Sequence, residues 1–413
     1  MILRARLVVP VGGAPIENGA VVLAAGRIEW VGPFGELPPG RGGEALDMGD
    51  CALLPGLVNA HCHLDYTGMA GQFEPPRRFS DWLKSIVALK GSWSVAEFAA
   101  SWEAGAAMLL RTGTTTVADV EAVPELLPAR WGRTPLRVFS FRELISIRSQ
   151  GLEPELVAEA ERQCLGWGGA PGQAGLSPHA PYTTNARLLD EAAQAAHRHQ
   201  WRLVTHVAES EEESEMYLYR QGGLYEWLKG QRDMSDCGLG TPVEYLDRCG
   251  YLDRNVLAVH ANYLGQRDAA LLAGSGASVV HCPRSHQFFR HLRFPLDDLA
   301  SAGVNLCLGT DSLASVRRAG GAMPELDLFA EMQTLAQARP DLRPADILAM
   351  ATRHGARALG LEGELGEISP GARADLIAVP LPAAGDPLEA MVYRSGPVTA
   401  SMIGGEWAVP PPR

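Results

Sequence analysis

The chain of 413 residues has little lysine, no surplus of basic charge and no long hydrophobic run. Only three of its 36 basic residues are lysines: Lys84, Lys90 and Lys229. Acidic residues number 48, so the net charge is −12, which argues against nucleic acid or an anionic membrane as the main partner. No apolar run approaches the roughly eighteen residues of a membrane-spanning helix. We therefore expect a protein that binds neither nucleic acid nor membrane.

The seven cysteines are scattered and include no CxxC pair, and their odd number is typical of reduced thiols. Near the N-terminus, Arg4 and Arg6 precede an apolar stretch that Pro10, Gly12 and Gly13 interrupt. That pattern predicts a strand and a turn and not a signal peptide. Both observations favour a cytoplasmic protein.

The hydrophobic content of 46% is enough for a large core, and the pattern of apolar runs divides the chain into two kinds of segment. Short β-rich runs separated by glycine turns occupy both chain ends. Between the ends, apolar runs alternate with helix-like stretches, which indicates a parallel sheet covered by helices. At this length an α/β barrel with eight strands, a (β/α)8 TIM barrel, is favoured over an open sheet. We predict a barrel domain over residues 57–361 and a small β-sandwich domain built from residues 1–56 and 362–413.

Histidines close several of the strand-like runs. His61 and His63 follow the run that begins at Leu57, and because side chains alternate along a strand they face the same side. His206, His260 and His281 each end a later apolar run, and Asp311 follows another. The carboxyl ends of barrel strands carry the active site in TIM-barrel enzymes. Three imidazoles and one carboxylate are a ligand set that suits one divalent ion, Zn²⁺ or Fe²⁺.

The motifs PGLVNAHCHL (55–64), THVAES (205–210), VHANYL (259–264), HCPRSH (281–286) and LGTDSLAS (308–315) resemble the amidohydrolase superfamily. Within it, the chain is most similar to the branch of cytosine, guanine, S-adenosylhomocysteine and aminofutalosine deaminases and triazine chlorohydrolases. The resemblance extends over nearly the whole chain.

The resemblance assigns roles by position. It implies that the metal ligands are His61, His63, His206 and Asp311, and that Glu209 moves protons. It implies that His260 polarises the reacting group or the water, that His179 contacts the substrate, and that His281, in the position of the HNP motif, supports the site from a second layer. Glu211, Glu212 and Glu213 are interpreted as the solvated acidic first turn of a helix.

The scarcity of lysine bears on the number of metal ions. Many members of the superfamily hold two metals bridged by a carbamylated lysine at the end of the fourth barrel strand. That strand here carries Ser177, Pro178 and His179, and no lysine lies between residues 91 and 228. We therefore expect a single ion, zinc with iron as the alternative.

Such an ion lowers the pKa of a bound water from about 15.7 towards 7 and so supplies hydroxide at neutral pH. Asp311 accepts the proton of the water, and Glu209 delivers a proton to the ring nitrogen beside the attacked carbon. The reaction implied is deamination of an amino-substituted purine or related N-heterocycle with release of ammonia. Hydrolytic dechlorination would use the same residues, and a non-catalytic binding protein is disfavoured because every ligand is present.

The substrate is less well defined by the sequence. Trp82 resembles family residues that close on the substrate, but the acidic residue that usually follows the Trp-Leu pair and binds ribose is missing. Arg142, Arg148 and Arg290 are candidates to pair with a substrate carboxylate. A carboxylate-bearing adenine derivative, 6-aminodeoxyfutalosine of menaquinone biosynthesis, is the leading prediction. S-adenosylhomocysteine or methylthioadenosine, guanine, pterins and triazines remain alternatives, and we expect a homodimer.

Overall fold

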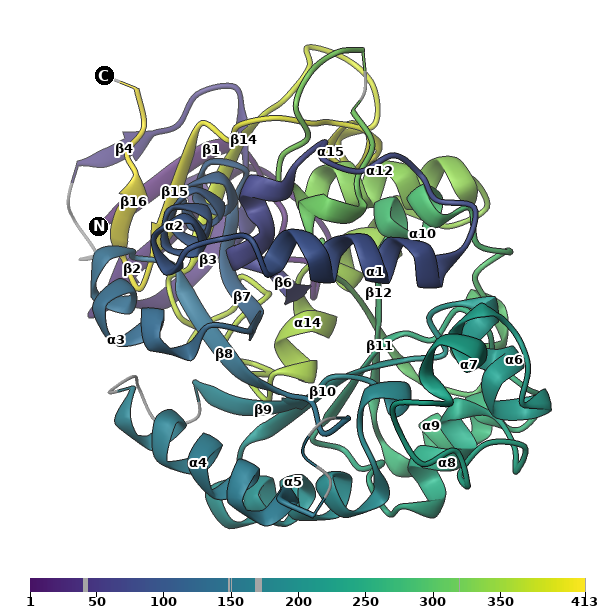
Figure 1. The fold of residues 1–413 in the computed structure, drawn as a ribbon. Helices are drawn as coiled ribbons and strands as arrows, with labels where there is room; N and C mark the ends of the chain where they lie inside the picture. Colours follow the sequence, from purple (N-terminus) through teal and green to yellow (C-terminus); the bar gives the residue numbers. More distant parts are fainter. Residues whose placement is uncertain (40–43, 148, 150, 168–172, 319, 413) are drawn as a thin grey trace.

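Eight parallel strands form the centre of the molecule in a computed structural model, which describes residues 1–39, 44–147, 149, 151–167, 173–318 and 320–412 (Figure 1). Each strand pairs with its neighbour in chain order. They are almost completely buried, as expected of parallel strands with helices on their outer face. In order, they are β6 (Leu57–Cys62), β7 (Thr114–Glu121), β8 (Arg137–Leu144), β9 (Ala174–Pro178), β10 (Arg202–Val207), β11 (Val256–His260), β12 (Ser278–His281) and β13 (Asn305–Leu308).

The first and last of these strands close the sheet into a barrel. Cys62 and Asp311 form an isolated parallel bridge, and the backbone N–H groups of Thr310 and Asp311 donate to the carbonyl oxygen of His61 at 3.0 and 3.2 Å. The predicted (β/α)8 barrel is thereby confirmed. Closure also brings Asp311 beside His61, although 250 residues separate them in the chain.

Helices surround the barrel, and short 3₁₀ turns follow several strand ends. Capping boxes stabilise the N-termini of two of these helices. Ser94 and Glu97 form one at the start of α2 (Val95–Arg111), and Thr241 and Glu244 form the other at the start of α8 (Pro242–Arg248). The α-helices are α1 (Phe79–Lys90), α2 (Val95–Arg111), α3 (Leu127–Arg130), α4 (Glu153–Gly166), α5 (Ala186–His199), α6 (Glu211–Tyr219), α7 (Gly223–Leu228), α8 (Pro242–Arg248), α9 (Asp268–Ser275), α10 (Pro283–Phe289), α11 (Leu296–Ser301), α12 (Leu328–Ala338), α13 (Pro344–Met350), α14 (Arg353–Ala358) and α15 (Pro387–Val392). The 3₁₀ turns are η1 (Phe34–Glu36), η2 (Leu64–Met69), η3 (Pro124–Leu126), η4 (Trp131–Arg133), η5 (Pro181–Thr183) and η6 (Leu313–Ser315).

The two chain ends meet in a second β domain, where the purple N-terminal and yellow C-terminal strands lie side by side in Figure 1. Its hydrogen bonds link eight strands in one sheet, because β5 pairs with β1 on one side and with β14 on the other. A separate apolar core that includes Leu3, Leu53 and Met402 lies within it. The strands are β1 (Ile2–Val8), β2 (Ile16–Ala24), β3 (Arg27–Pro33), β4 (Ala45–Asp47), β5 (Cys51–Pro55), β14 (Leu376–Pro380), β15 (Ala400–Ile403) and β16 (Glu406–Val409).

A domain built from both ends is confirmed, whereas its exact boundaries stay a prediction. β5 ends at Pro55 in the terminal sheet and β6 begins at Leu57 in the barrel, so the chain passes between the sheets there. The ion pair of Arg137 and Asp375, at 3.1 Å, fastens the barrel to the terminal domain.

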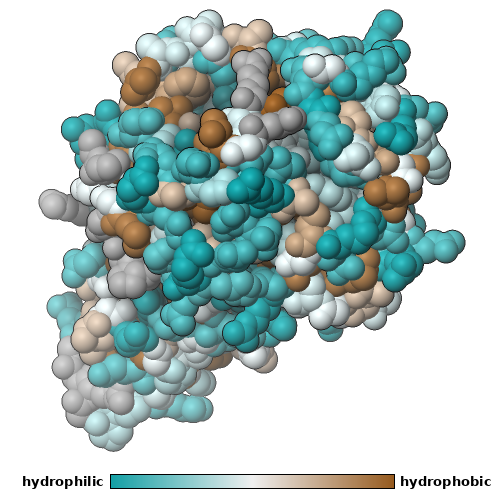
Figure 2. Space-filling view, turned by 60° about the horizontal axis from the view of Figure 1, so that its bottom comes forward, coloured by the Kyte–Doolittle hydropathy of each residue, from teal (hydrophilic) through white to brown (hydrophobic). Residues whose placement is uncertain are grey.

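In the described ranges, no helix has both the length and the apolar composition needed to cross a membrane. The face of the molecule in Figure 2 is covered mostly by hydrophilic side chains, with hydrophobic ones in small separate groups. That face therefore shows no extended apolar surface of the kind that obligate dimers bury, and the homodimer remains a prediction.

Candidate active site

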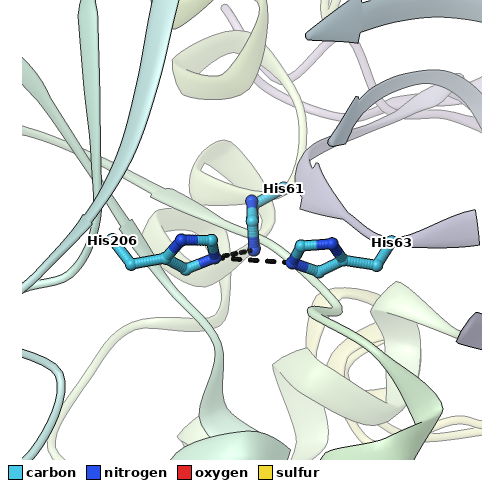
Figure 3. A group of neighbouring side chains, drawn as sticks. All are labelled: His61, His63 and His206. Carbon is cyan, nitrogen blue, oxygen red and sulfur yellow. Dashed lines mark hydrogen bonds between the residues drawn. The ribbon is translucent and has the colours of Figure 1, made fainter. Parts of the chain in front are cut away.

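Three imidazoles converge at the carboxyl ends of the barrel strands. His61 belongs to β6, His63 lies just before η2, and His206 belongs to β10. The Nε2 atom of His206 lies 3.3 Å from Nε2 of His61 and 3.4 Å from Nε2 of His63, and Figure 3 marks both contacts with dashed lines. All three side chains are buried, with 0, 6 and 4% exposure respectively. The three ring nitrogens thus face one common point.

A hydrogen bond to the backbone determines which ring nitrogen of His206 carries the proton. Its Nδ1 lies 2.8 Å from the carbonyl oxygen of His179, so Nδ1 donates and Nε2 keeps a lone pair. Burial, with the neighbouring His61 and His179, lowers the pKa of His206 to about 3. His206 is therefore neutral at pH 7, as a metal ligand must be.

The spacing of these nitrogens fits a tetrahedral metal ion. With zinc–nitrogen bonds of about 2.0–2.1 Å, a tetrahedral ion holds its nitrogens about 3.3 Å apart. Asp311 adds an oxygen: its Oδ1 lies 3.6 Å from Nε2 of His61 and 3.8 Å from Nε2 of His63. Three imidazoles and one carboxylate make a donor set for one divalent ion with a position left for water.

The other oxygen of Asp311 is held by two serines. Oδ2 accepts hydrogen bonds from the hydroxyls of Ser285 at 2.7 Å and Ser315 at 2.9 Å. Burial disfavours the charged carboxylate, but the hydrogen bond to His61 and the nearby His260 outweigh it, so the pKa of Asp311 lies well below its usual range. Such outer partners orient a ligand and leave its free oxygen turned to the ion. The motifs 281–286 and 308–315 contained both serines, but nothing in the sequence marked them as partners of Asp311.

Glu209 lies beside the proposed ion-binding residues. Its Oε1 is 3.6 Å from Nε2 of His260, and its side chain is buried. Burial, strengthened by the charges of Asp311 and Glu213, raises the pKa of Glu209 well above its ordinary value. A raised pKa favours the protonated form of a carboxyl group, and in that form the group can act as a general acid.

The prediction that the acidic turn after Glu209 is solvated is wrong for Glu213. Glu211 is exposed, but Glu213 is completely buried, and its Oε2 accepts a hydrogen bond of 2.8 Å from the backbone N–H of Glu209. On the other side, the side-chain amide of Asn262 donates to the carbonyl oxygen of Glu209 at 2.9 Å. These contacts fix the backbone of Glu209 between α6 and the end of β11.

The backbone at this edge of the barrel contains several non-glycine residues with positive φ. They are Ala208 at 50°, His260 at 75°, Ala261 at 49° and Asp311 at 52°. Non-glycine residues rarely adopt this region and persist there when the surrounding structure compensates the cost, often at functional sites. These angles aim the side chains that follow β10, β11 and β13.

A pocket opens above these residues. His179, Tyr182 and Ser312 contribute to its lining, and α1 and α7 contribute apolar side chains. Trp82 is one of these side chains, with its indole N–H 3.4 Å from the carbonyl oxygen of Ala314. The pocket is lined by His63, Tyr66, Trp82, Leu83, Ile86, Val87, Lys90, Glu143, Ile145, Ile147, His179, Tyr182, Thr183, His206, Glu209, Trp227, Leu228, His260, Asp311 and Ser312.

His281 and two of the candidate arginines lie elsewhere. The ring of His281 stacks on Phe294 at 3.8 Å, and it lines another cavity together with Arg290. The carbonyl oxygen of His281 accepts from the N–H of Gly309, so His281 supports the strand that leads to Asp311 through its backbone. Arg142 bonds to Gln163 of α4 at 3.0 Å, away from the pocket. Arg148, the third candidate, lies outside the described residues.

Two charged pocket residues, Glu143 and Lys90, are among those that the sequence reasoning missed. Glu143, next to Arg142 on β8, points into the barrel mouth because side chains alternate along a strand. Its Oε2 lies 3.8 Å from Nζ of Lys90 at the end of α1. Burial opposes the charge of Glu143, but Lys90 and His179 outweigh it, so the pKa of Glu143 is lowered. The strand alternation could have revealed Glu143, but its pairing with Lys90 depends on where α1 packs.

Comparisons with known proteins agree with this geometry. The model of the amidohydrolase family matches residues 52–408. A 5-methylthioadenosine/S-adenosylhomocysteine deaminase of Syntrophobacter fumaroxidans is 32% identical, over 95% of this chain and 88% of its own. The zinc-bound structure of an adenosine deaminase from Xanthomonas campestris is 28% identical, with a TM-score of 0.82 over 98% of this chain and 92% of that chain. The Helicobacter pylori aminofutalosine deaminase in complex with methylthio-coformycin has a TM-score of 0.87 at 22% identity, covering 98% of this chain and 99% of that one, a likeness of fold.

Proposed function

We propose a substrate for this chain, which belongs to the amidohydrolase family and is a metal-dependent deaminase. The enzyme removes the 6-amino group of an adenine nucleoside whose 5′ substituent is largely apolar, such as 5′-methylthioadenosine. The observation that carries the deaminase chemistry is the convergence of His61, His63, His206 and Asp311 beside the buried side chain of Glu209. The metal ion proposed is a single zinc.

The roles of the residues follow from their positions. When bound, the zinc supplies an activated water for attack on the carbon that carries the amino group. Glu209, whose raised pKa favours its protonated form, donates a proton to the ring nitrogen beside that carbon. It then takes up a proton that the attacking water loses and passes that second proton to the leaving amine. His260, 3.6 Å from Glu209, is neutral because burial lowers its pKa well below the usual value. It therefore offers a neutral hydrogen-bonding group at the attacked carbon.

The single-ion expectation is supported by two features. The fourth barrel strand is β9, and it ends in Ser177 and Pro178, followed by His179, so no lysine stands at the bridging position. Within the described ranges, the groups of three potential ligand side chains that converge within 4.8 Å all include His61. Both features describe one ion-binding centre.

The choice of substrate is supported by the walls of the pocket. Trp82, Leu83 and Ile86 of α1 and Trp227 and Leu228 of α7 present an apolar surface that suits a purine and an alkylthio group. The prediction of 6-aminodeoxyfutalosine depends on an arginine at the mouth. Arg142 and Arg290 are not among the described residues that line the pocket, whereas Arg148 lies outside the described residues, so 6-aminodeoxyfutalosine stays the alternative substrate.

An ammonia-release screen tests the proposal. We expect 5′-methylthioadenosine to give the highest kcat/KM among a set that includes S-adenosylhomocysteine, 6-aminodeoxyfutalosine, adenine, guanine, a pterin and an amino-triazine. Higher activity on a free base or a triazine than on any nucleoside would contradict it. Replacing Arg142 or Arg290 with Met should leave the ratio of kcat/KM between carboxylated and uncarboxylated nucleosides unchanged.

A further inference from the structure

Two charged residues that line the pocket, Glu143 and Lys90, have no role in the deamination chemistry described above. Glu143 at the end of β8 is 9% exposed, and Nζ of Lys90 lies 3.8 Å from its Oε2. The same Nζ lies 4.7 Å above the ring of Tyr66, which stacks on His63 at 5.1 Å. The ring of Tyr66 therefore lies in contact with both Lys90 and His63, a proposed metal ligand. The pair lies close to the reacting centre without belonging to it.

The carboxylate of Glu143 has acceptor capacity to spare. Among the described residues it accepts no protein hydrogen bond, and Lys90 is its one ion-pair partner, at a distance beyond a hydrogen bond. A buried carboxylate that is paired but lacks hydrogen-bond donors is poorly compensated for its lost hydration. Because Glu143 lines the pocket, donors from a ligand can complete its environment.

The order of strands around the barrel separates Glu143 from Glu209 and His260, the residues proposed to act on the base. Glu209 follows β10 and His260 ends β11, whereas β8 is separated from β11 by two strands. A heterocycle with its reacting edge at Glu209 and His260 thus has its far side directed towards β8 and the end of α1. The charged pair meets the part of the substrate that does not react.

We propose that Glu143 binds the two neighbouring hydroxyls of the substrate sugar and that Lys90 holds its carboxylate in place. This inference rests on the proposed function and adds to it a preference for ribonucleosides. The two oxygens of one carboxylate match two adjacent O–H donors, and a neutral diol suits a carboxylate whose charge Lys90 already balances. Val87, Ile145 and Ile147 line the pocket beside the pair and offer an apolar surface to the 5′ substituent.

The test compares 5′-methylthioadenosine with its 2′,3′-dideoxy analogue in the metal-loaded full chain. E143Q removes the charge with little change of shape and should lower kcat/KM for the diol substrate by about 10- to 100-fold, the value of charge-assisted hydrogen bonds. For the dideoxy analogue the change should stay within about threefold. The wild type should itself prefer the diol by a similar factor.

Lys90 is a positioning residue, so its effect must act through Glu143. K90M should lower kcat/KM for the diol substrate alone, and the double variant K90M/E143Q should be no worse than E143Q, since coupled residues are not additive. If E143Q alone folds poorly because it leaves Lys90 unpaired, the double variant, which removes both charges, replaces it. Metal content and Tm are measured for each variant.

Matched controls are Glu155→Gln and Lys229→Met, which change an exposed carboxylate and an exposed lysine outside the pocket and should leave both substrates unaffected. Equal losses on both substrates, or no loss on either, would overturn the role of Glu143. Absence of ammonia from both nucleosides with the wild type would instead overturn the proposed function, and the sugar assignment with it. The two failures are therefore distinguishable.

Discussion

Replacement of Glu209 with Gln separates proton transfer from metal binding. Glu209 is 5% exposed, and burial, together with the charges of Asp311 and Glu213, raises its pKa well above the ordinary value, which favours its protonated form. Glutamine keeps the size and the hydrogen-bonding shape but has no transferable proton. Loss of general acid–base assistance typically costs 10²–10⁴-fold in rate, so kcat should fall by about that factor.

The metal content should stay unchanged in the same variant, because His61, His63, His206 and Asp311 are untouched. Ammonia release measured by a coupled assay gives kcat, and elemental analysis gives the metal per chain. Glu211→Gln is the matched control: it lies two residues further on, is exposed, and should keep full activity. Near-normal turnover in Glu209→Gln, or an equal loss in Glu211→Gln, would refute the assignment of the proton carrier.

Three further predictions follow from the same site. His61→Ala and Asp311→Ala each remove a ligand and should lose both metal and activity, and elemental analysis showing two metals per wild-type chain would contradict the single-ion site. Ser285→Ala removes the 2.7 Å hydrogen bond to Asp311 and should weaken metal binding by about 10- to 100-fold in chelator competition; unchanged affinity would show that Ser315 alone orients the carboxylate. Burial raises the folded-state pKa of Glu213 to about 8, above its value in the unfolded chain. Between those two pKa values the folded state binds a proton that the unfolded state has lost. The free energy of unfolding should therefore fall as pH rises from about 4.5 to 8. Glu213→Gln should flatten part of that slope in denaturant titrations, and a slope identical to that of the wild type would rule Glu213 out as its source.

The substrate end of the pocket shows where prediction from sequence reached its limit. The sequence predicts Arg142 as a partner for a substrate carboxylate, yet Arg142 bonds to Gln163 of α4, and its neighbour on β8, Glu143, lines the pocket instead. Which of two adjacent residues faces inward depends on strand register, which the β8 segment alone does not define. Lys90 lies 53 residues before Glu143 in the chain, and only the packing of α1 over the barrel brings the two together.

Glu213 illustrates the same limit for electrostatics. Three consecutive glutamates in the first turn of a helix are most simply a solvated group attracted by the helix dipole. In the folded chain α6 packs so that Glu211 faces water and Glu213 faces the backbone of Glu209. Burial, and with it the pKa of each carboxyl, is a property of the surroundings that charge pattern alone does not reveal.

The sequence by itself determined the class of fold and the chemistry at the strand ends. The alternation of apolar strand-like runs with helix-like runs can be recognised in the sequence alone. Apolar strand-like runs lead directly to His61, His63, His206, His260 and Asp311. Parallel strands in a barrel bring their carboxyl ends to one edge, so side chains at those ends must meet. The tertiary structure decided the rest: the closure that places Asp311 beside His61, the serines that hold Asp311, and the pairing of Glu143 with Lys90. These contacts join residues far apart in the chain through packing, which no local pattern encodes.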